Sequence, residues 1–417
     1  MESICINENI NLHYIPMQKL KTTSIGVYIH RQLCKEEVSE NALLPYVLKR
    51  GCRLCKGSAE IAVYLEGLYG ASFGASVMKL GDDQVIYMGF ETISDRYAPE
   101  GEKLAEQLAR LMLSVLFEPS AFTEDIIAQE KKNAVQRIMS EINDKRVYAQ
   151  KRCMEEMFGK EAFALGAFGT VEGIEKITAP ALKAYYESII TASPIDIYVC
   201  GDADAGSLAE EIRSYTDGMS FTKSALPKSS LFAGGGEIKR VTDHMEVTQG
   251  KLSLGFKTGI PADSEDYAAI MVLCSVFGGG AHSKLFNNVR EKLSLCYYAS
   301  SALVKNKGVM FVNAGIEFQN FRKAYDEILV QLEAVKRGDI TELEFASSIG
   351  FLQNQLEGYK DDERLMQVFS LGQRISGTNM DVDELKEKIG KVTVEDIKRV
   401  SLGVTLDTVY FLSGEEA

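Results

Sequence analysis

The chain lacks several features that would place it in a membrane or on nucleic acid. None of its apolar runs approaches the roughly 20 residues that a membrane-spanning helix needs. Its first residues, MESICINENINLHYIP, lack the basic start, long apolar stretch and small-residue cleavage site of a signal peptide. Basic residues are outnumbered, because 46 Lys and Arg stand against 59 Asp and Glu and the net charge is −13. We therefore expect a cytoplasmic protein that binds neither nucleic acid nor a membrane surface.

Residues that bind metals are also few and poorly spaced. No two of the four histidines have the i, i+4 spacing of a helical zinc site: His13, His30, His244 and His282. One Cys-x-x-Cys pair occurs at residues 52–55, but a structural zinc site needs a second pair, which the sequence does not have. The eight cysteines are scattered through a long chain without a signal peptide, so we expect reduced thiols rather than disulfides. The sequence therefore predicts no metal and no other cofactor.

The chain does have the size and composition of a soluble protein with more than one core. Its 417 residues, 46% of them hydrophobic, suffice for two or three domains. The run SALPKSSLFAGGGE at residues 224–237 has little to bury and no reason to be helical, which is typical of a linker. We predict an N-terminal domain over residues 1–223, a linker over 224–237 and a C-terminal domain over 238–417.

The two halves contain similar motifs in the same order. SIGVY at 24–28 recurs as SLGFK at 253–257, and GFE at 89–91 recurs as GIE at 315–317. IEKIT at 174–178 recurs as IGKVT at 389–393. Each match alone is weak, but three in sequence with slowly drifting offsets indicate a duplicated domain.

Each half mixes strand and helix patterns. Alternating segments such as residues 25–29 and 84–90 predict half-buried strands. Helical periodicity appears over 104–112 and 126–138, and residues 124–154 predict one long or slightly broken helix. Strict alternation of strand and helix is absent. We therefore expect an α+β fold in which each half is a mainly antiparallel sheet covered by helices on one face.

Residues 41–51 predict a short helix with a buried side. Ser39 or Asn41 is expected to cap its start, Pro45 to lie in or near its first turn, and Gly51 to end it. Its buried stripe consists of Leu43, Leu44, Val47 and Leu48. From this segment alone, a helix of the protein core is the plainest interpretation.

The same segment resembles the zinc helix of the pitrilysin/insulinase-like metallopeptidases. Active members carry His-x-x-Glu-His on a short helix that ends in Lys-Gly. Matching the Arg-Gly at residues 50–51 to that ending places Ala42 and Tyr46 at the two histidines and Pro45 at the glutamate. Alanine has no lone pair for zinc, tyrosine is a poor ligand at neutral pH, and proline cannot act as a general base.

The third zinc ligand of this family is a glutamate on a later helix, seven residues after another acidic residue. Here Glu130 matches the upstream acid, but Arg137 stands in the ligand's place, where a fixed positive charge repels a dication. The resemblance therefore implies an inactive, zinc-free member. Its degenerate zinc-site positions are Ala42, Pro45, Tyr46 and Arg137.

The segment FGGGAHSKLFNNVREKLSLCY at 277–297 resembles the family most closely. It matches a Gly-rich turn, then Ser-x-Leu, then Arg-Glu-Lys-x-x-Leu-x-Tyr. In the family, this arginine and the tyrosine seven residues later hold the substrate backbone and stabilise the oxyanion of the tetrahedral intermediate. Arg290 and Tyr297 have that spacing. The alternative is that Arg290 lies on a solvated helix face and Tyr297 merely starts a strand.

The resemblance covers nearly the whole chain, and it implies an architecture and a function. The two halves are expected to close like a clamshell around a chamber. Substrate is expected to add as a strand, for which GASFGASV at 70–77 offers small residues. The function implied is that of a non-catalytic subunit of a heterodimeric zinc peptidase, lending Arg290 and Tyr297 to a homologous zinc-bearing partner that cleaves a peptide.

Two alternatives remain from the sequence. The chain is either a structural or peptide-binding scaffold without a proteolytic role, or an enzyme of unrelated chemistry. A pure scaffold has no need of the Arg290 and Tyr297 pair, so its retention beside an erased zinc site favours the subunit hypothesis.

Overall fold

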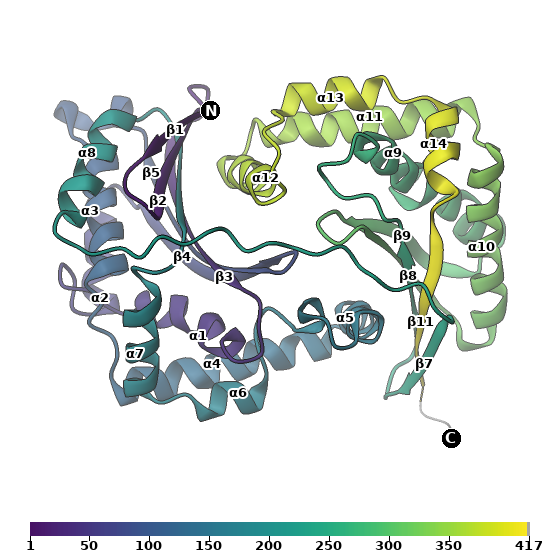
Figure 1. Cartoon of the computed structure of the whole chain (residues 1–417), viewed down its shortest axis with the longest axis horizontal. Helices are drawn as coiled ribbons and strands as arrows, with labels where there is room; N and C mark the ends of the chain where they lie inside the picture. The colour runs from purple at the N-terminus through teal and green to yellow at the C-terminus, as the bar shows by residue number, and fades with distance from the viewer. Residues whose placement is uncertain (415–417) are drawn as a thin grey trace. The chain divides into compact units, whose positions relative to one another are not determined.

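The computed structural model describes residues 1–414, which form two compact units (Figure 1). Unit 1 contains residues 1–138, 165–228 and 360–375. Unit 2 contains residues 139–164 and 229–359 and those from 376 onward. Each unit has one mainly antiparallel sheet with packed helices, so the α+β class expected from the sequence is confirmed.

The sheet of unit 1 has six strands in the order β1-β2-β6-β3-β5-β4. All neighbours are antiparallel except β2 and β6, which are parallel. Alternating residues of each strand point to opposite faces, and both faces carry large buried side chains. The strands are β1 (Glu2–Cys5), β2 (Ile10–Pro16), β3 (Thr22–Gln32), β4 (Ser72–Leu80), β5 (Asp83–Ile93) and β6 (Ile195–Gly201).

One face of this sheet is covered by helices from the first half of the chain (Figure 1). Strand residues such as Val27, Met88 and Ile197 point into that layer and are fully buried. Apolar residues recur on one side of each helix, which allows the helices to pack on the strands. The helices of this half are α1 (Val38–Leu48), α2 (Ser58–Gly67), α3 (Leu104–Phe117), α4 (Glu124–Asn143), α6 (Val171–Lys176), α7 (Ala179–Ile189) and α8 (Ala205–Thr216).

The opposite face of this sheet is covered by α12 (Glu363–Ile375), which comes from the second half of the chain. Leu371 of α12 packs into a cluster with Tyr28 and Tyr198 of the sheet. The helix also makes polar contacts: Gln367 accepts a hydrogen bond from the Tyr28 hydroxyl at 2.9 Å and donates one to Ser24 at 2.8 Å. This face is therefore a mixed polar and apolar interface.

The sheet of unit 2 has five strands in the order β7-β11-β8-β10-β9. Here β7 and β11 are parallel and all other neighbours are antiparallel. The strands are β7 (Lys239–His244), β8 (Gly250–Lys257), β9 (Cys296–Val304), β10 (Val309–Ile316) and β11 (Thr405–Ser413). The helices contributed by this half are α9 (Tyr267–Gly278), α10 (Phe321–Arg337), α11 (Glu342–Tyr359), α13 (Val382–Gly390) and α14 (Val394–Ser401).

Unit 2 also contains α5 (Lys145–Phe158), which comes from the first half of the chain and packs on β8 and β11. Residues 124–154, expected to form one long or slightly broken helix, are divided between α4 and α5 by Asp144. The Asp144 carboxylate accepts hydrogen bonds from the backbone N–H groups of Arg146 and Val147, which makes it the N-cap of α5.

The two halves share one topology, which confirms the duplication expected from the sequence. The strand order is β2-β6-β3-β5-β4 in the first sheet and β7-β11-β8-β10-β9 in the second. In each, the first two strands of that series are parallel and the others antiparallel. The repeated motifs lie at equivalent places. For example, Thr178 is the N-cap of α7 and Thr393 is the N-cap of α14. The helices α5 and α12 are also equivalent in element order, so each half gives the same helix to the other unit.

The predicted linker, residues 224–237, contains no helix or strand. It is anchored at Phe232, whose side chain is buried in an apolar cluster of unit 2 and whose backbone N–H donates to Lys307 at 3.0 Å. The domain limits at 223 and 238 stay predictions, because the compact units follow the packing of α5 and α12 rather than a single boundary.

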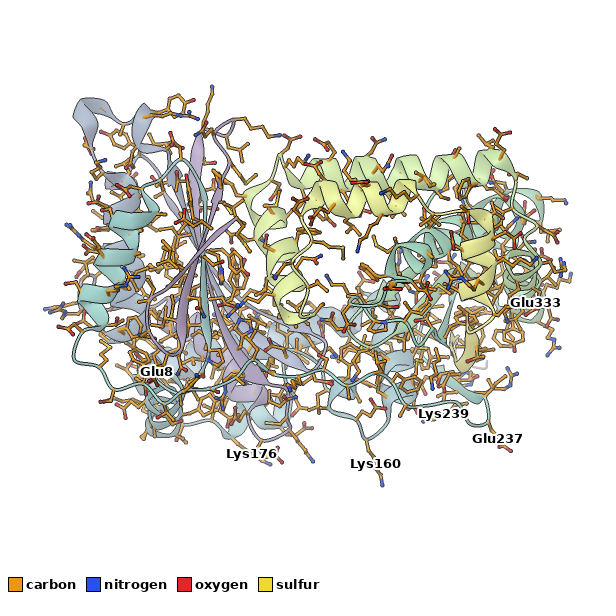
Figure 2. All side chains as sticks on the ribbon, turned by 45° about the horizontal axis from the view of Figure 1, so that its top comes forward. Glu8, Lys160, Lys176, Glu237, Lys239 and Glu333 are labelled. Carbon is orange, nitrogen blue, oxygen red and sulfur yellow. The ribbon has the colours of Figure 1, made fainter. Side chains whose placement is uncertain are left out.

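Charged side chains dominate the surface. Lys160, Lys176 and Glu237 are exposed and extend away from the ribbon (Figure 2). In the part of the chain that the structure describes, no helix is both long and apolar enough to cross a membrane.

Candidate functional site: a degenerate zinc site and an arginine–tyrosine segment

The helix that resembles the zinc helix starts earlier than the sequence predicts. Helix α1 begins at Val38 with Glu37 as its N-cap, so the prediction that Ser39 or Asn41 caps it was wrong. Both polar residues are buried inside the helix instead. Asn41 donates to Gln84 at 2.9 Å and accepts from Tyr185 at 2.6 Å, and these tertiary contacts satisfy the side chain without a capping role.

Pro45 lies in the interior of α1 rather than in its first turn, so that expectation was also wrong. Proline has no backbone N–H, and therefore the carbonyl of Asn41 lacks its normal helical donor. The helix continues nonetheless, with the N–H of Lys49 bonded to the carbonyl of Pro45 at 3.2 Å. A buried pyrrolidine ring stands where the resemblance places a general base.

Two of the degenerate positions meet in space. The Arg137 guanidinium, on α4, lies 3.6 Å from the centroid of the Tyr46 ring, on α1. Ala42 precedes Tyr46 by one helical turn and is 3% exposed. A cation held over an aromatic ring is a stabilising arrangement, and the planar guanidinium suits it. The structure thus brings together the positions that the resemblance assigns to two zinc ligands, although these residues came from distant parts of the sequence.

Glu130, which matches the upstream acid of the family, is buried and neutralised. Its carboxylate lies 3.5 Å from Nη1 of Arg50 and accepts a hydrogen bond from Asn133 at 3.2 Å. Arg50 is held in place by Gln129, which accepts from its Nη2 at 2.5 Å. The Glu130 carboxylate is therefore paired with a fixed cation.

The side chains at the degenerate site do not fit a zinc ion. Zinc needs deprotonated nitrogen, sulfur or carboxylate donors. The site offers instead a methyl group, a proline ring and a phenol covered by a guanidinium. Elsewhere in residues 1–414, no group of three or more His, Cys, Asp or Glu side chains could hold a metal ion.

The second candidate segment, residues 285–297, departs from regular backbone in three consecutive places. Residues Leu285–Lys292 form a π-helix that carries Arg290. Ser294 has a φ of 50°, in the left-handed region that non-glycine residues rarely adopt. In the β9–β10 pair, Tyr298 pairs with Gly315 and Cys296 with Ile316, so Tyr297 is the extra residue of a bulge. Such irregularities concentrate at functional sites, where they redirect side chains.

Both side chains of this segment are available at the surface of unit 2. The Arg290 side chain is 40% exposed, stacks on Phe286 at 4.6 Å and lies 3.3 Å from the Glu291 carboxylate. Tyr297 is 60% exposed. Its hydroxyl donates a hydrogen bond to Glu317, and this bond raises the pKa of the phenol, which keeps the O–H protonated. Tyr297 is therefore a donor that Glu317 holds in place.

A buried ionic network in unit 1 escaped the sequence analysis. His30 places Nδ1 2.6 Å from Asp83 and Nε2 3.3 Å from Asp196. Asp196 also lies 3.2 Å from His13 and 2.5 Å from Nε of Arg374, which belongs to α12. Burial would lower the pKa of His30, but Asp196 and Asp83 raise it to about 9. Burial likewise opposes ionisation of Asp196, yet hydrogen bonds from His13 and His30 lower its pKa.

This network fastens α12 to β6. The signal in the sequence was one ionisable residue in each of two largely apolar strands, His30 in β3 and Asp196 in β6. Only the pairing of β3 with β5 and β6 reveals that His30, Asp83 and Asp196 meet.

Several known proteins are similar to this chain. Residues 176–350 match the family model described as "Peptidase M16 inactive domain". Over 417 aligned residues the chain is 34% identical to "Probable inactive metalloprotease YmfF" of Bacillus subtilis (strain 168), covering 98% of this chain and 96% of that protein. The chain belongs to the M16 peptidase family.

Solved structures share the fold of this chain. A conserved protein from Enterococcus faecalis V583 is 28% identical, covers 99% of this chain and 98% of its own, and superposes with a TM-score of 0.89. A structure titled as the peptidase M16 inactive domain from Pseudomonas fluorescens is 18% identical, covers 100% and 98%, and has a TM-score of 0.82, so it shows the fold alone. The resemblance to inactive metallopeptidases drawn from the sequence is confirmed, and the chain is an inactive M16 member.

Proposed function

We propose that this chain is the non-catalytic subunit of a heterodimeric zinc peptidase. A homologous partner carries the zinc and cleaves the peptide. This chain supplies Arg290 and Tyr297, which hold the substrate backbone and stabilise the oxyanion that develops in the partner's active site. The alternative is a structural or peptide-binding scaffold that takes no part in proteolysis.

The proposal rests on a contrast between two sites of one chain: the zinc-binding residues are replaced, whereas the arginine and tyrosine are kept. The zinc positions are filled by Ala42, Pro45, Tyr46 and Arg137, which cannot bind zinc. The 285–297 segment instead retains its arginine and tyrosine on an exposed surface and on irregular backbone. Strained backbone is costly, and a scaffold gains nothing from keeping it.

Open sheet edges support peptide binding. Strand β4, which contains most of the small-residue segment 70–77, is the terminal strand of the unit 1 sheet and pairs only with β5. Gly74 is exposed, and a Cβ built there meets no atom closer than 4.0 Å, so a second backbone has room to approach. An added strand bonds through main-chain N–H and C=O groups. A peptide with alternate N-methylated amides should therefore bind more weakly than its parent sequence.

The decisive test measures assembly and turnover together. The tagged chain is used to isolate its zinc-bearing partner, and the heterodimer is then prepared with Arg290→Ala, Tyr297→Phe or both. Size-exclusion chromatography reports assembly and metal analysis reports the partner's zinc. Each variant should assemble and keep zinc, while kcat falls about 10²–10³-fold, because loss of one oxyanion donor typically costs that much. Arg322→Ala serves as the matched control, since Arg322 is an exposed arginine of unit 2 whose guanidinium contacts Asp326 and Tyr325 of its own helix.

The position of Glu317 sharpens the test. A phenol has one O–H, so Tyr297 must leave Glu317 before it can donate to a substrate. Glu317→Gln should therefore change kcat in the assembled enzyme while Arg322→Ala does not. Wild-type turnover from a fully assembled Arg290→Ala, Tyr297→Phe double variant would overturn the proposal and leave the scaffold role.

A further inference from the structure

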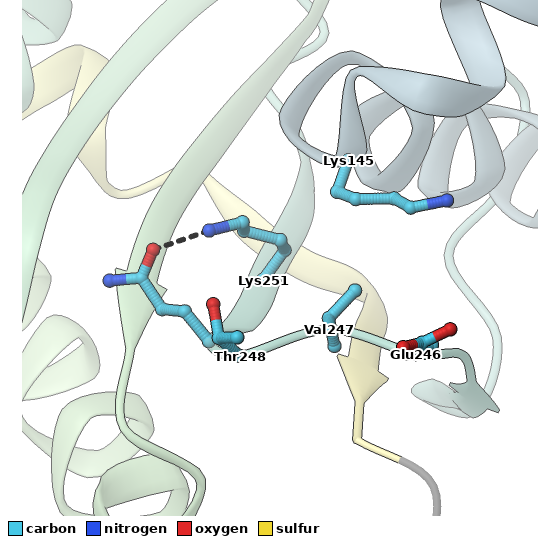
Figure 3. Close-up of a pocket in the computed structure, with 6 residues that line it drawn as sticks. Lys145, Glu246, Val247, Thr248 and Lys251 are labelled. Atoms are coloured by element: carbon cyan, nitrogen blue, oxygen red, sulfur yellow. Dashed lines mark hydrogen bonds between the residues drawn. The ribbon is translucent and has the colours of Figure 1, made fainter.

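A pocket of about 450 Å³ lies in unit 2, where the first turn of α5 faces β8. Lys145, on α5, and Lys251, on β8, line it from two sides, and residues 246–249 form the rest of its wall (Figure 3). The volume falls within the range of small-ligand sites. Neither the degenerate zinc positions nor Arg290 and Tyr297 belong to its lining.

Three cations lie at or near this pocket: Lys145 and Lys251 line it, with their ammonium groups pointing to different sides, and Arg146 follows Lys145 in the chain (Figure 3). Lys145 donates to the carbonyl of Ile142 at 3.0 Å, and Lys251 donates to the side-chain oxygen of Gln249. Arg146, which follows Lys145 on α5, carries the third charge. Throughout residues 1–414 no carboxylate forms an ion pair with any of the three, although acidic residues outnumber basic ones in the chain. An ammonium group has three donors, so each lysine keeps donors for a ligand.

Two of these cations lie near one aromatic ring, that of Tyr298. The Arg146 guanidinium lies 4.4 Å from the centroid of the Tyr298 ring, and the Lys251 ammonium lies 5.9 Å from it. Gly315 pairs with both Tyr298 and Lys251 across the sheet. A Cβ at Gly315 would lie only 2.4 Å from the Tyr298 ring, so the absence of a side chain allows the ring to cross the sheet toward Lys251.

The charges near this cluster partly offset one another. Burial lowers the pKa of Lys251, the attraction of Asp144 raises it, and Arg146 lowers it less strongly. The Asp144 carboxylate is already engaged with the first N–H groups of α5. Glu246 is exposed at the pocket wall. A bound anion would add a second attractive charge for these cations beside that of Asp144.

We propose that this pocket binds a side-chain carboxylate of an acidic peptide. Ammonium donors on two sides of a pocket, with the Arg146 guanidinium near the Tyr298 ring that Lys251 also approaches, suit a carboxylate, which accepts several hydrogen bonds at once. A peptide is the favoured source because Tyr298 follows Tyr297 on β9, the terminal strand of its sheet. In this respect the inference rests on the proposed function, and it adds that the substrates carry acidic residues.

The test uses the full chain alone, so it does not depend on a partner. A fluorescein-labelled peptide with three consecutive glutamates is titrated with the protein by fluorescence anisotropy, beside the same peptide with three glutamines. The glutamate peptide should bind at least tenfold more tightly at low salt, and this preference should shrink at 1 M salt, where the Debye length is about 3 Å. Inorganic phosphate and citrate are added as competitors to distinguish a free anion from a peptide.

Variants assign the binding to the pocket. Lys251→Gln and Arg146→Gln should each weaken the glutamate peptide about 3–5-fold, as expected for exposed charge pairs, and the double variant about tenfold or more. Gly315→Ala should weaken it without any change of charge, because the added methyl group displaces the Tyr298 ring. Lys391→Gln is the matched control: it removes one exposed lysine of unit 2, whose partner is Glu387, and should leave binding unchanged.

Three results would overturn the inference. They are equal affinity for the two peptides, equal weakening by Lys391→Gln and Lys251→Gln, and binding of phosphate without binding of the glutamate peptide. Circular dichroism of each variant shows whether it is folded. Since Arg290 and Tyr297 are unchanged here, a negative result leaves the proposed function standing, and failure of the turnover test leaves this binding result standing.

Discussion

The buried imidazole of His30 makes the stability of unit 1 depend on pH. Its side chain is fully buried between Asp83 and Asp196, which raise its pKa from the ordinary 6.5 to about 9 against the opposing effect of burial. Because the folded pKa lies above the unfolded one, the charged form stabilises the fold fully below pH 6.5. That contribution is lost as the pH rises toward 9. At about 1.4 kcal/mol per pKa unit, the shift corresponds to about 3 kcal/mol.

His30→Gln tests this reasoning, because glutamine keeps hydrogen-bonding capacity and cannot carry the charge. Urea unfolding followed by far-UV circular dichroism gives the free energy of unfolding at pH 6 and pH 9.5. The loss caused by His30→Gln should be about 3 kcal/mol greater at pH 6 than at pH 9.5. The matched control is His244→Gln, since His244 is exposed and its Nδ1 lies 2.9 Å from the Gly414 carbonyl oxygen rather than near a carboxylate.

An NMR titration gives an independent measure. The His30 ring signals in the wild-type chain should titrate with a midpoint near 9. A midpoint at or below 6.5, or a destabilisation by His30→Gln that is the same at both pH values, would refute the assignment of a buried imidazolium.

Three further predictions concern the metal, α12 and α5. The chain purified alone should contain no stoichiometric zinc by metal analysis and cleave no peptide, and one tightly held zinc lost on mutating Tyr46 would contradict this. Burial raises the pKa of Glu363 on α12 to about 7. Ionisation of Glu363 therefore destabilises the fold as the pH rises from 4.5 through 7. In urea unfolding at pH 8, the free energy of unfolding of Glu363→Gln should exceed that of wild type by about 1–2 kcal/mol, and at pH 5 the two should not differ in this way. Asp144→Ala should cost about 1 kcal/mol through the lost N-cap of α5, seen as faster amide hydrogen exchange in that helix.

Local pattern was enough to predict the elements and the repeat. Alternation in residues 25–29 and 84–90 predicted strands, because that pattern depends on neighbours one and two residues away, and these residues lie in β3 and β5. The repeated IEKIT and IGKVT motifs mark a helix end followed by a threonine cap, a feature that is likewise local. The α+β class and the duplicated topology follow from such information.

Tertiary packing decided what the sequence did not reveal. The start of α1 at Val38 depends on burial of Asn41 against Gln84 and Tyr185, which lie far along the chain. The exchange of α5 and α12 has no periodic signature, because an amphipathic helix shows which side is buried and not which sheet buries it. At the candidate site, the seven-residue spacing indicated Arg290 and Tyr297. The bulge at Tyr297 and its hydrogen bond to Glu317 depend on residues distant in the sequence, so only the fold reveals them.

The exchanged helix α12 has a consequence for the order of events during synthesis. Translation delivers the six strands of the first sheet by residue 201, yet the helix that covers their second face is complete only at residue 375. Until then Leu371 cannot pack against Tyr28 and Tyr198, and Asp196 lacks its ion pair with Arg374. The growing chain therefore displays a partly apolar sheet face on the ribosome for as long as most of unit 2 is being made. Chains released early, near the linker, should aggregate or be retained by chaperones, whereas chains extended past residue 375 should not.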